Sequence, residues 1–191
     1  VESDEAFDGI SNTELAAIFG QSGESSNVRL ALRLFHYGCP AVYLDQGGYD
    51  YHSGEEDNLP DALERVNRLI SGLCHVLPKM KHPDGGSYWD HTVVAFGSEF
   101  SRTAHGGRFN SARGSDHSGD YATRWMSMPF FGGPIAGGRV VGATTNRDDL
   151  SPDGTVYSYR SVLNTLMDGL GCDTSAFFPG DGVVPDLLGA G

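Results

Sequence analysis

Apolar residues recur at three- and four-residue steps in four parts of the chain, and this spacing is typical of helices that bury one face. Ser11 and Glu14 form a capping-box pattern before the first of them, and Gly20 follows it as a stop signal. Two serines precede the second, Pro60 stands in the first turn of the third, and Ser158 precedes the fourth. The sequence therefore predicts helices at residues 15–19, 27–37, 59–77 and 159–170.

Short continuous apolar runs predict strands between these helices. Residues 41–44, 92–96 and 125–131 are such runs, and Thr-Val-Val-Ala-Phe at 92–96 has the composition of a strand buried on both faces. A strand, a helix and a second strand in this order favour a right-handed βαβ unit. We therefore predict an α/β fold with a mostly parallel sheet flanked by helices.

The length of 191 residues is sufficient for one domain with its own core. Residues 1–26 are mostly polar and form the predicted N-terminal segment of that domain. Residues 98–123 are rich in Gly, Ser, Arg and His and show no hydrophobic period. Because a loop of this length inside a compact domain is usually functional or disordered, we expect it to contribute to a site.

The charge balance argues against two kinds of partner. The chain has 25 acidic and 13 basic residues and a net charge of −12, whereas a protein that binds nucleic acid needs clustered Lys and Arg to neutralise phosphates. The same charge disfavours docking on an anionic membrane, and no apolar run approaches the roughly 20 residues that a spanning helix needs. The excess of acid serves either solubility or a site where carboxylates surround a cation.

Three cysteines, Cys39, Cys74 and Cys172, lie far apart and form no C-x-x-C pair, which argues against a thiolate zinc site. One disulfide with one free thiol and three buried thiols both fit this number, and we expect buried thiols. The N-terminal residues show no signal peptide. A start at Val1 rather than Met leads us to expect a processed, trimmed or partial chain.

Side chains with metal-ligand chemistry follow two of the predicted strands. Asp50 and His52 lie two residues apart after the first strand, and alternate residues of an extended segment point to the same side, so both side chains can face one cation. Glu99 comes directly after the strand at 92–96, and ligands in open α/β sheets bind beyond the carboxyl ends of strands. The alternatives are a loop Asp beside a surface His, and a Glu99–Arg102 ion pair within a turn.

A third cluster lies within the long polar loop. Glycines flank Asp116 and His117 and allow the backbone to bend tightly around whatever these side chains hold, and the alternative is an Asx-type turn beside an exposed His. The three clusters supply two imidazoles and three carboxylates, which suits Zn²⁺ or Mn²⁺, and Ca²⁺ or Mg²⁺ if oxygen ligands dominate. The remaining histidines are expected to be structural or surface residues, with His105 close to the candidate site.

Four motifs occur in an order that resembles one known family. They are Gly-Gly-Tyr-Asp-Tyr-His at 47–52, Ser-Glu-Phe-Ser-Arg-Thr at 98–103, Gly-Ser-Asp-His at 114–117 and a hairpin with two Gly-Gly pairs at 132–142. The chain resembles the C-terminal half of the bacterial domain of unknown function 1501 family, which is placed in the alkaline phosphatase and sulfatase superfamily. The resemblance spans nearly all of the chain and implies the C-terminal half of an alkaline-phosphatase-like fold.

The resemblance also implies which residues hold metal ions. Asp50 and His52 would bind one divalent metal, Glu99 would bind the other, and His117 would return to the first, with Asp116 in the same ligand set. We therefore expect these side chains to converge within one site.

The resemblance further implies what the chain does and what it lacks. Arg102 would neutralise charge that develops on a phosphate or sulfate oxygen, because its planar fork matches both groups. Phe100 stands where many superfamily enzymes carry a metal-binding His. The superfamily's nucleophile and first metal-binding carboxylate belong to the N-terminal half, and no segment here matches them.

Two classes of function follow from this comparison. One is a metal-dependent hydrolase of phosphate or sulfate esters, exported to the periplasm or the extracellular space. The other is a non-catalytic structural or assembly subunit that keeps the fold. Both imply a partner chain, a homo-oligomer or a separate N-terminal half, because half of a sheet leaves an unpaired edge.

Overall fold

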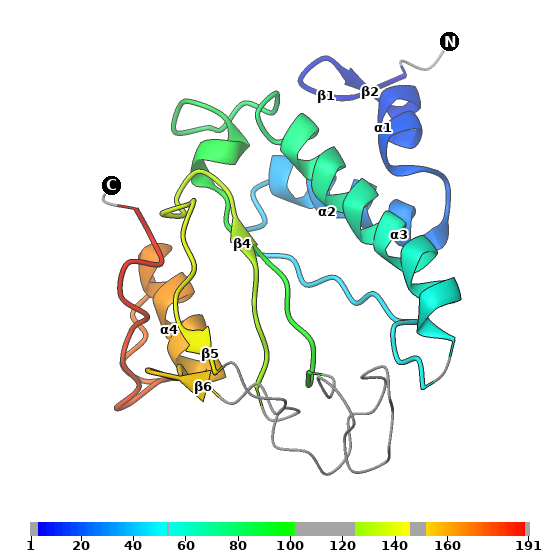
Figure 1. The fold of residues 1–191 in the computed structure, drawn as a ribbon. Coiled ribbons are helices and arrows are strands. Elements are labelled where there is room, and N and C mark those ends of the chain that lie inside the picture. The colour runs from blue at the N-terminus through cyan, green and yellow to red at the C-terminus, as the bar shows by residue number, and fades with distance from the viewer. Residues whose placement is uncertain (1–3, 53, 102–124, 146–151, 190–191) are drawn as a thin grey trace. The chain divides into compact units, whose positions relative to one another are not determined.

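The structure, a computed structural model, describes residues 4–52, 54–101, 125–145 and 152–189 of the chain (Figure 1). The chain forms two compact units, Val1–His91 and Thr92–Gly191. The first contains a hairpin and the helices α1, α2 and α3, and the second contains short strands and the helix α4. Each unit is a single continuous stretch of the chain, so its elements follow one another in the sequence.

A two-stranded hairpin begins the first unit. Strands β1 (Glu5–Phe7) and β2 (Ile10–Ser11) pair antiparallel, and both residues of the turn between them, Asp8 and Gly9, have positive φ angles of 49° and 77°. Asp-Gly is a preferred pair for such a turn. Phe7 and Ile10 are each only 3% exposed. The N-terminal segment predicted as polar therefore contributes to the core.

The caps of the first two helices explain where they begin. Helix α1 (Asn12–Phe19) starts where the Ser11 hydroxyl accepts a hydrogen bond from the Glu14 amide at 2.9 Å, as the capping-box pattern predicts. Helix α2 (Gly23–His36) starts four residues before the predicted helix at 27–37, because Ser22 caps the Ser25 amide at 3.2 Å. Ser25 instead donates its hydroxyl to the carbonyl oxygen of Phe19.

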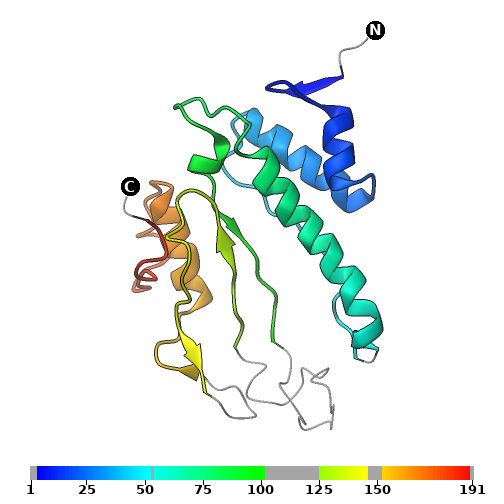
Figure 2. The same cartoon turned by 45° about the horizontal axis from the view of Figure 1, so that its top comes forward.

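Helix α3 (Glu55–Val76) is the longest element, and Figure 2 shows it extended along the first unit. It begins before the predicted position, so Pro60 lies inside the helix instead of in its first turn. Gly72 faces the Phe19 ring so closely that an added Cβ atom would lie 2.2 Å from a ring carbon. The fully buried side chains of this unit come from α1, α2 and the C-terminal end of α3 with the turn that follows it, and they are Leu15, Leu32, Val76, Leu77 and Met80.

The connection from α2 to α3 is extended but contains no strand. The predicted strand at 41–44 has no partner among the described residues, and Tyr43 is 86% exposed. After α3, a short 3₁₀ helix, η1 (Tyr88–His91), closes the unit. The Tyr88 hydroxyl anchors it by donating a hydrogen bond to the carbonyl oxygen of Phe35 at 2.6 Å.

Short antiparallel strand pairs make up the sheets of the second unit. Strand β3 (Val94–Ala95) pairs with β4 (Phe130–Phe131), and β5 (Ala143–Thr144) pairs with β6 (Pro152–Asp153). Val94 is half-buried and Ala95 is exposed, so the run at 92–96 is not buried on both faces as predicted. The described residues contain no parallel pair, and the parallel sheet stays a prediction.

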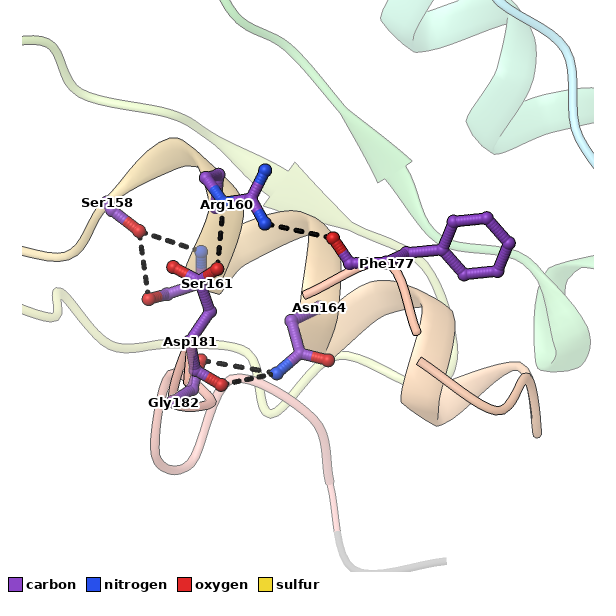
Figure 3. A network of polar contacts seen from close by, with 7 residues as sticks. All are labelled: Ser158, Arg160, Ser161, Asn164, Phe177, Asp181 and Gly182. Carbon is purple, nitrogen blue, oxygen red and sulfur yellow. Dashed lines mark hydrogen bonds and ion pairs between the residues drawn. The ribbon is translucent and has the colours of Figure 1, made fainter. Parts of the chain in front are cut away.

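Helix α4 (Tyr159–Gly169) holds the C-terminal segment through a polar network (Figure 3). Asn164 donates its amide to the carbonyl oxygen of Asp181 at 2.9 Å, and Arg160 Nε donates to the Asp181 carboxylate at 2.8 Å. Thr165 accepts a hydrogen bond from the Val184 amide at 2.7 Å. Beneath this network Val162, Val184 and Leu187 form an apolar core.

Two further expectations concern membrane-spanning helices and the cysteines. In the described ranges, none of the helices combines the length and the apolar composition that crossing a bilayer requires. All three cysteines are free, and Cys74 and Cys172 are exposed. The expectation of buried thiols was therefore wrong for these two, because Cys74 lies on an exposed part of α3 and Cys172 follows the end of α4.

Candidate functional site

The extended connection between α2 and α3 carries the first pair of candidate metal ligands. His52 Nε2 lies 3.4 Å from Asp50 Oδ1, and each side chain is 57% exposed. The Tyr51 amide donates a hydrogen bond to the carbonyl oxygen of Tyr49 at 2.9 Å, so the backbone turns tightly at Asp50 and does not run as a straight strand beside this pair. A carboxylate and an imidazole that lie together and face solvent fit a divalent metal such as Zn²⁺ or Mn²⁺ in ligand chemistry.

The residue before this pair is packed against α3. The guanidinium carbon of Arg65 lies 5.3 Å from the centroid of the Tyr49 ring, and Tyr49 is half-buried. Burial raises the pKa of the Tyr49 phenol, and the positive charge of Arg65 opposes part of that rise. One side of the segment is thus fixed to a helix, while Asp50 and His52 face water.

A groove of about 580 Å³ lies beside this segment within the first unit. Its apolar lining comes from Phe19, Val28 and Leu69, and the rest is lined by charged side chains of α2 and α3 together with serines, a glycine and Gln46. Among them, Arg65 Nη1 lies 3.7 Å from Glu24 Oε1. The sequence analysis did not identify Arg65, since its position on α3 shows no motif, and only the fold brings it to Tyr49.

The other predicted site residues cannot be placed beside Asp50 and His52. Glu99 belongs to the second unit, where it is exposed after β3. The predicted residues Arg102, Asp116 and His117 lie outside the described residues. Convergence of these side chains in one site therefore stays a prediction, and so does the Glu99–Arg102 ion pair.

No complete ligand set is found within the described part of the chain. Across residues 4–52, 54–101, 125–145 and 152–189, no three side chains of His, Cys, Asp or Glu come together in a way that could hold a metal ion. The Asp50–His52 pair supplies two ligands, whereas a zinc site takes at least three from the protein. Further ligands would have to join this pair.

Four histidines that the sequence analysis assigned to structural or surface roles make local contacts. His36 stacks on Phe7 with 5.5 Å between ring centroids, and His75 Nε2 lies 2.7 Å from the Lys79 ammonium. His82 and His91 stack face to face with their ring centroids 3.9 Å apart. The stacking of His82 on His91 was not foreseen, because eight residues lie between them and only the turn after α3 brings them together.

Comparison with known proteins gives one match. The family described as "Protein of unknown function (DUF1501)" matches residues 5–183, a range that includes all four motifs of the sequence analysis. Neither the curated proteins nor the solved structures contain a match to the chain.

Proposed function

This chain belongs to the DUF1501 family, and from that premise we propose that it is a metal-binding domain of the alkaline phosphatase and sulfatase type. In this proposal the domain hydrolyses phosphate or sulfate esters as part of a larger protein or complex. The observation that carries the proposal is the Asp50–His52 pair, whose side chains lie 3.4 Å apart and face solvent. Both residues also lie in the Gly-Gly-Tyr-Asp-Tyr-His motif at 47–52, which supports the proposal.

The residues of this chain would divide into metal ligands and one charge-neutralising group. The ligands would be Asp50, His52, Glu99, Asp116 and His117. Arg102 would bind a non-bridging oxygen of the ester through two parallel N–H donors. A bound divalent metal would act as a Lewis acid on the ester oxygens. The nucleophile would come from a segment outside these 191 residues, and we propose that the protein works outside the cytoplasm.

A non-catalytic assembly subunit is the second candidate function, and one observation favours it. Within the described residues no strand pairs with the extended segment 41–45, and Tyr43 and Leu44 on it are exposed. Unpaired extended backbone with apolar side chains is a template for another strand. A partner chain, a second copy of this chain or an N-terminal half would supply that strand.

Metal binding by the 191-residue chain tests the proposal directly. We expect the apo-chain to bind Zn²⁺ or Mn²⁺ in calorimetric titration, and we expect Asp50→Asn and His52→Gln each to weaken binding by at least about tenfold, because each removes one ligand. His75→Gln is the matched control, since His75 is an exposed histidine of the same unit that contacts Lys79. Equal affinity in Asp50→Asn and the unaltered chain would reject the metal site.

Turnover of aryl phosphate and aryl sulfate esters separates the two candidate functions. A hydrolase predicts metal-dependent release of the aryl alcohol once the partner segment is supplied, and loss of that release in Asp50→Asn. An assembly subunit predicts no turnover under any combination of partner and metal, whether or not the chain binds metal. The absence of metal binding together with the absence of turnover would leave the assembly role alone.

A further inference from the structure

The side chain of Arg65 on α3 contacts both α2 and the connection between α2 and α3. Arg65 Nη1 lies 3.7 Å from Glu24 Oε1 in the first turn of α2, and its guanidinium carbon lies 5.3 Å from the Tyr49 ring. Gln46 donates from Nε2 to the second oxygen of Glu24 at 3.4 Å. The segment that ends in Asp50 and His52 is therefore fastened at Gln46 and at Tyr49.

The approach of Arg65 to the backbone reinforces these contacts. Gly48 has a φ angle of +88°, a conformation that favours glycine, and a Cβ atom added there would lie 3.4 Å from Arg65 Nη2. The guanidinium thus covers the main chain at Gly48 as well as the neighbouring ring. A planar guanidinium can stack on an aromatic ring and pair with a carboxylate at the same time, which a lysine ammonium cannot do.

We propose that Arg65 is a positioning residue for the Asp50–His52 metal pair. This inference rests on the proposed function, since it holds that the contacts of Arg65 position ligands of the proposed metal site. Arg65 reaches neither Asp50 nor His52 with any contact described above. It acts through Tyr49, Gly48 and, by way of Glu24, Gln46.

The contacts of Arg65 are individually weak, which indicates that Arg65 orders the segment locally and contributes little to the stability of the whole fold. The side chains of Arg65 and Glu24 are 43% and 38% exposed, and exposed ion pairs contribute little to global stability. Removing the guanidinium should therefore leave the fold intact. What it removes is the restraint on a glycine-containing segment whose two ligands must hold a fixed separation to bind one cation.

Helix α3 offers a matched control one turn from Arg65. Arg68 lines the same groove, is similarly exposed, and forms its ion pair with Glu64 of its own helix at a distance of 3.3 Å. Arg65→Met and Arg68→Met therefore remove the same charge from the same helix. Only the first also removes a contact to the segment that carries the metal pair.

The experiment compares these variants in the full 191-residue chain with two measurements. Metal affinity is measured with Zn²⁺ and Mn²⁺, and order in residues 47–52 is measured by amide hydrogen exchange without metal. We expect Arg65→Met to weaken metal affinity by about tenfold, the lower end of the effect of altering groups that orient ligands, and to speed exchange in 47–52. Arg68→Met should change neither, and Arg65→Lys should fall between, since it keeps the charge but not the planar stack.

The possible results distinguish a failure of the positioning role of Arg65 from a failure of the proposed metal site. If the unaltered chain binds metal and Asp50→Asn weakens binding, but Arg65→Met behaves like Arg68→Met, the positioning role is overturned and the metal site stands. If the unaltered chain binds no metal, both proposals are overturned. If Arg65→Met speeds exchange in 47–52 without changing affinity, Arg65 orders the segment for another reason, which also overturns the inference.

Discussion

At the scale of single residues, the most informative contact is the one between Gly72 of α3 and the Phe19 ring. Three ring atoms would lie within 2.2–2.8 Å of a Cβ atom added at Gly72. Phe19 is 3% exposed, so neighbouring side chains surround nearly all of its ring. Gly72 therefore sets how closely α1 and α3 approach each other.

We predict that Gly72→Ala destabilises the protein although alanine is the better helix former. Glycine to alanine in a helix interior normally stabilises by about 1 kcal/mol, whereas overpacking a core costs about 1–3 kcal/mol. We expect the overpacking to dominate because the clash involves an aromatic ring in the core. Urea denaturation of the chain measures the change in the free energy of unfolding.

The Phe19→Leu background provides the control for this prediction. With the ring gone, Gly72→Ala should become neutral or stabilising, so the two substitutions should couple strongly in a double-mutant cycle. Additive effects, or a stabilising Gly72→Ala in the unaltered chain, would contradict the close approach of α1 and α3.

At the scale of elements, capping chemistry determined how much the sequence could predict. The fourth helix was predicted correctly from Ser158, whose hydroxyl accepts a hydrogen bond from the Ser161 amide at 2.9 Å. The start of α2 was missed, because Ser22, Ser25 and Ser26 all have cap chemistry and only the fold selects one of them. The β1–β2 hairpin was also missed, although its Asp-Gly turn is a local signal for a hairpin.

The candidate site shows the same division between local and distant information. Asp50 and His52 could be predicted as a pair because a single residue separates them, although the chain turns at Asp50 and is not extended there. Arg65 could not be predicted, because sixteen positions separate it from Tyr49. The residues between Tyr49 and Arg65 must be folded before the two side chains meet. The strand at 41–44 illustrates a third case, in which apolar composition predicts a strand but pairing depends on a partner.

We predict that Thr165→Val loosens the attachment of the C-terminal segment to α4. The Thr165 hydroxyl accepts a hydrogen bond from the buried Val184 amide at 2.7 Å, and valine keeps the shape but leaves that amide without an acceptor. An unsatisfied buried donor costs about 1–3 kcal/mol. Thermal unfolding measures the loss, and amide exchange at Val184 locates it.

Thr165→Ser keeps the hydroxyl and serves as the control for this change. Serine should cost less than valine, even though it removes a methyl group from the side chain. A larger loss of stability for serine than for valine would show that packing, and not the hydrogen bond to Val184, holds the segment.

At the scale of the whole molecule, exposed apolar side chains on unpaired backbone favour association. Tyr43 is 86% exposed on a segment with no strand partner among the described residues. We predict that the isolated chain self-associates at micromolar concentration and that Tyr43→Lys reduces this, because a charge on an edge opposes strand pairing. Sedimentation velocity measures both effects.

Leu63 provides a matched control for the association, because it is 53% exposed but lies within α3, where the helix already uses the backbone hydrogen-bonding groups. Leu63→Lys adds the same charge to the chain and should leave the association unchanged. A monodisperse monomer that unfolds cooperatively at micromolar concentration would show that segment 41–45 needs no partner.

The division of the chain at His91 also bears on how the protein is made. All residues of the first unit precede all residues of the second, and the buried side chains of the first unit, from Phe7 to Tyr88, belong to that stretch alone. During synthesis all residues of this core therefore emerge from the ribosome before those of β3. The first unit, with Asp50 and His52 on its surface, can fold while the second is still emerging, so nascent chains long enough to expose residue 91 outside the ribosome would already bring these two side chains together.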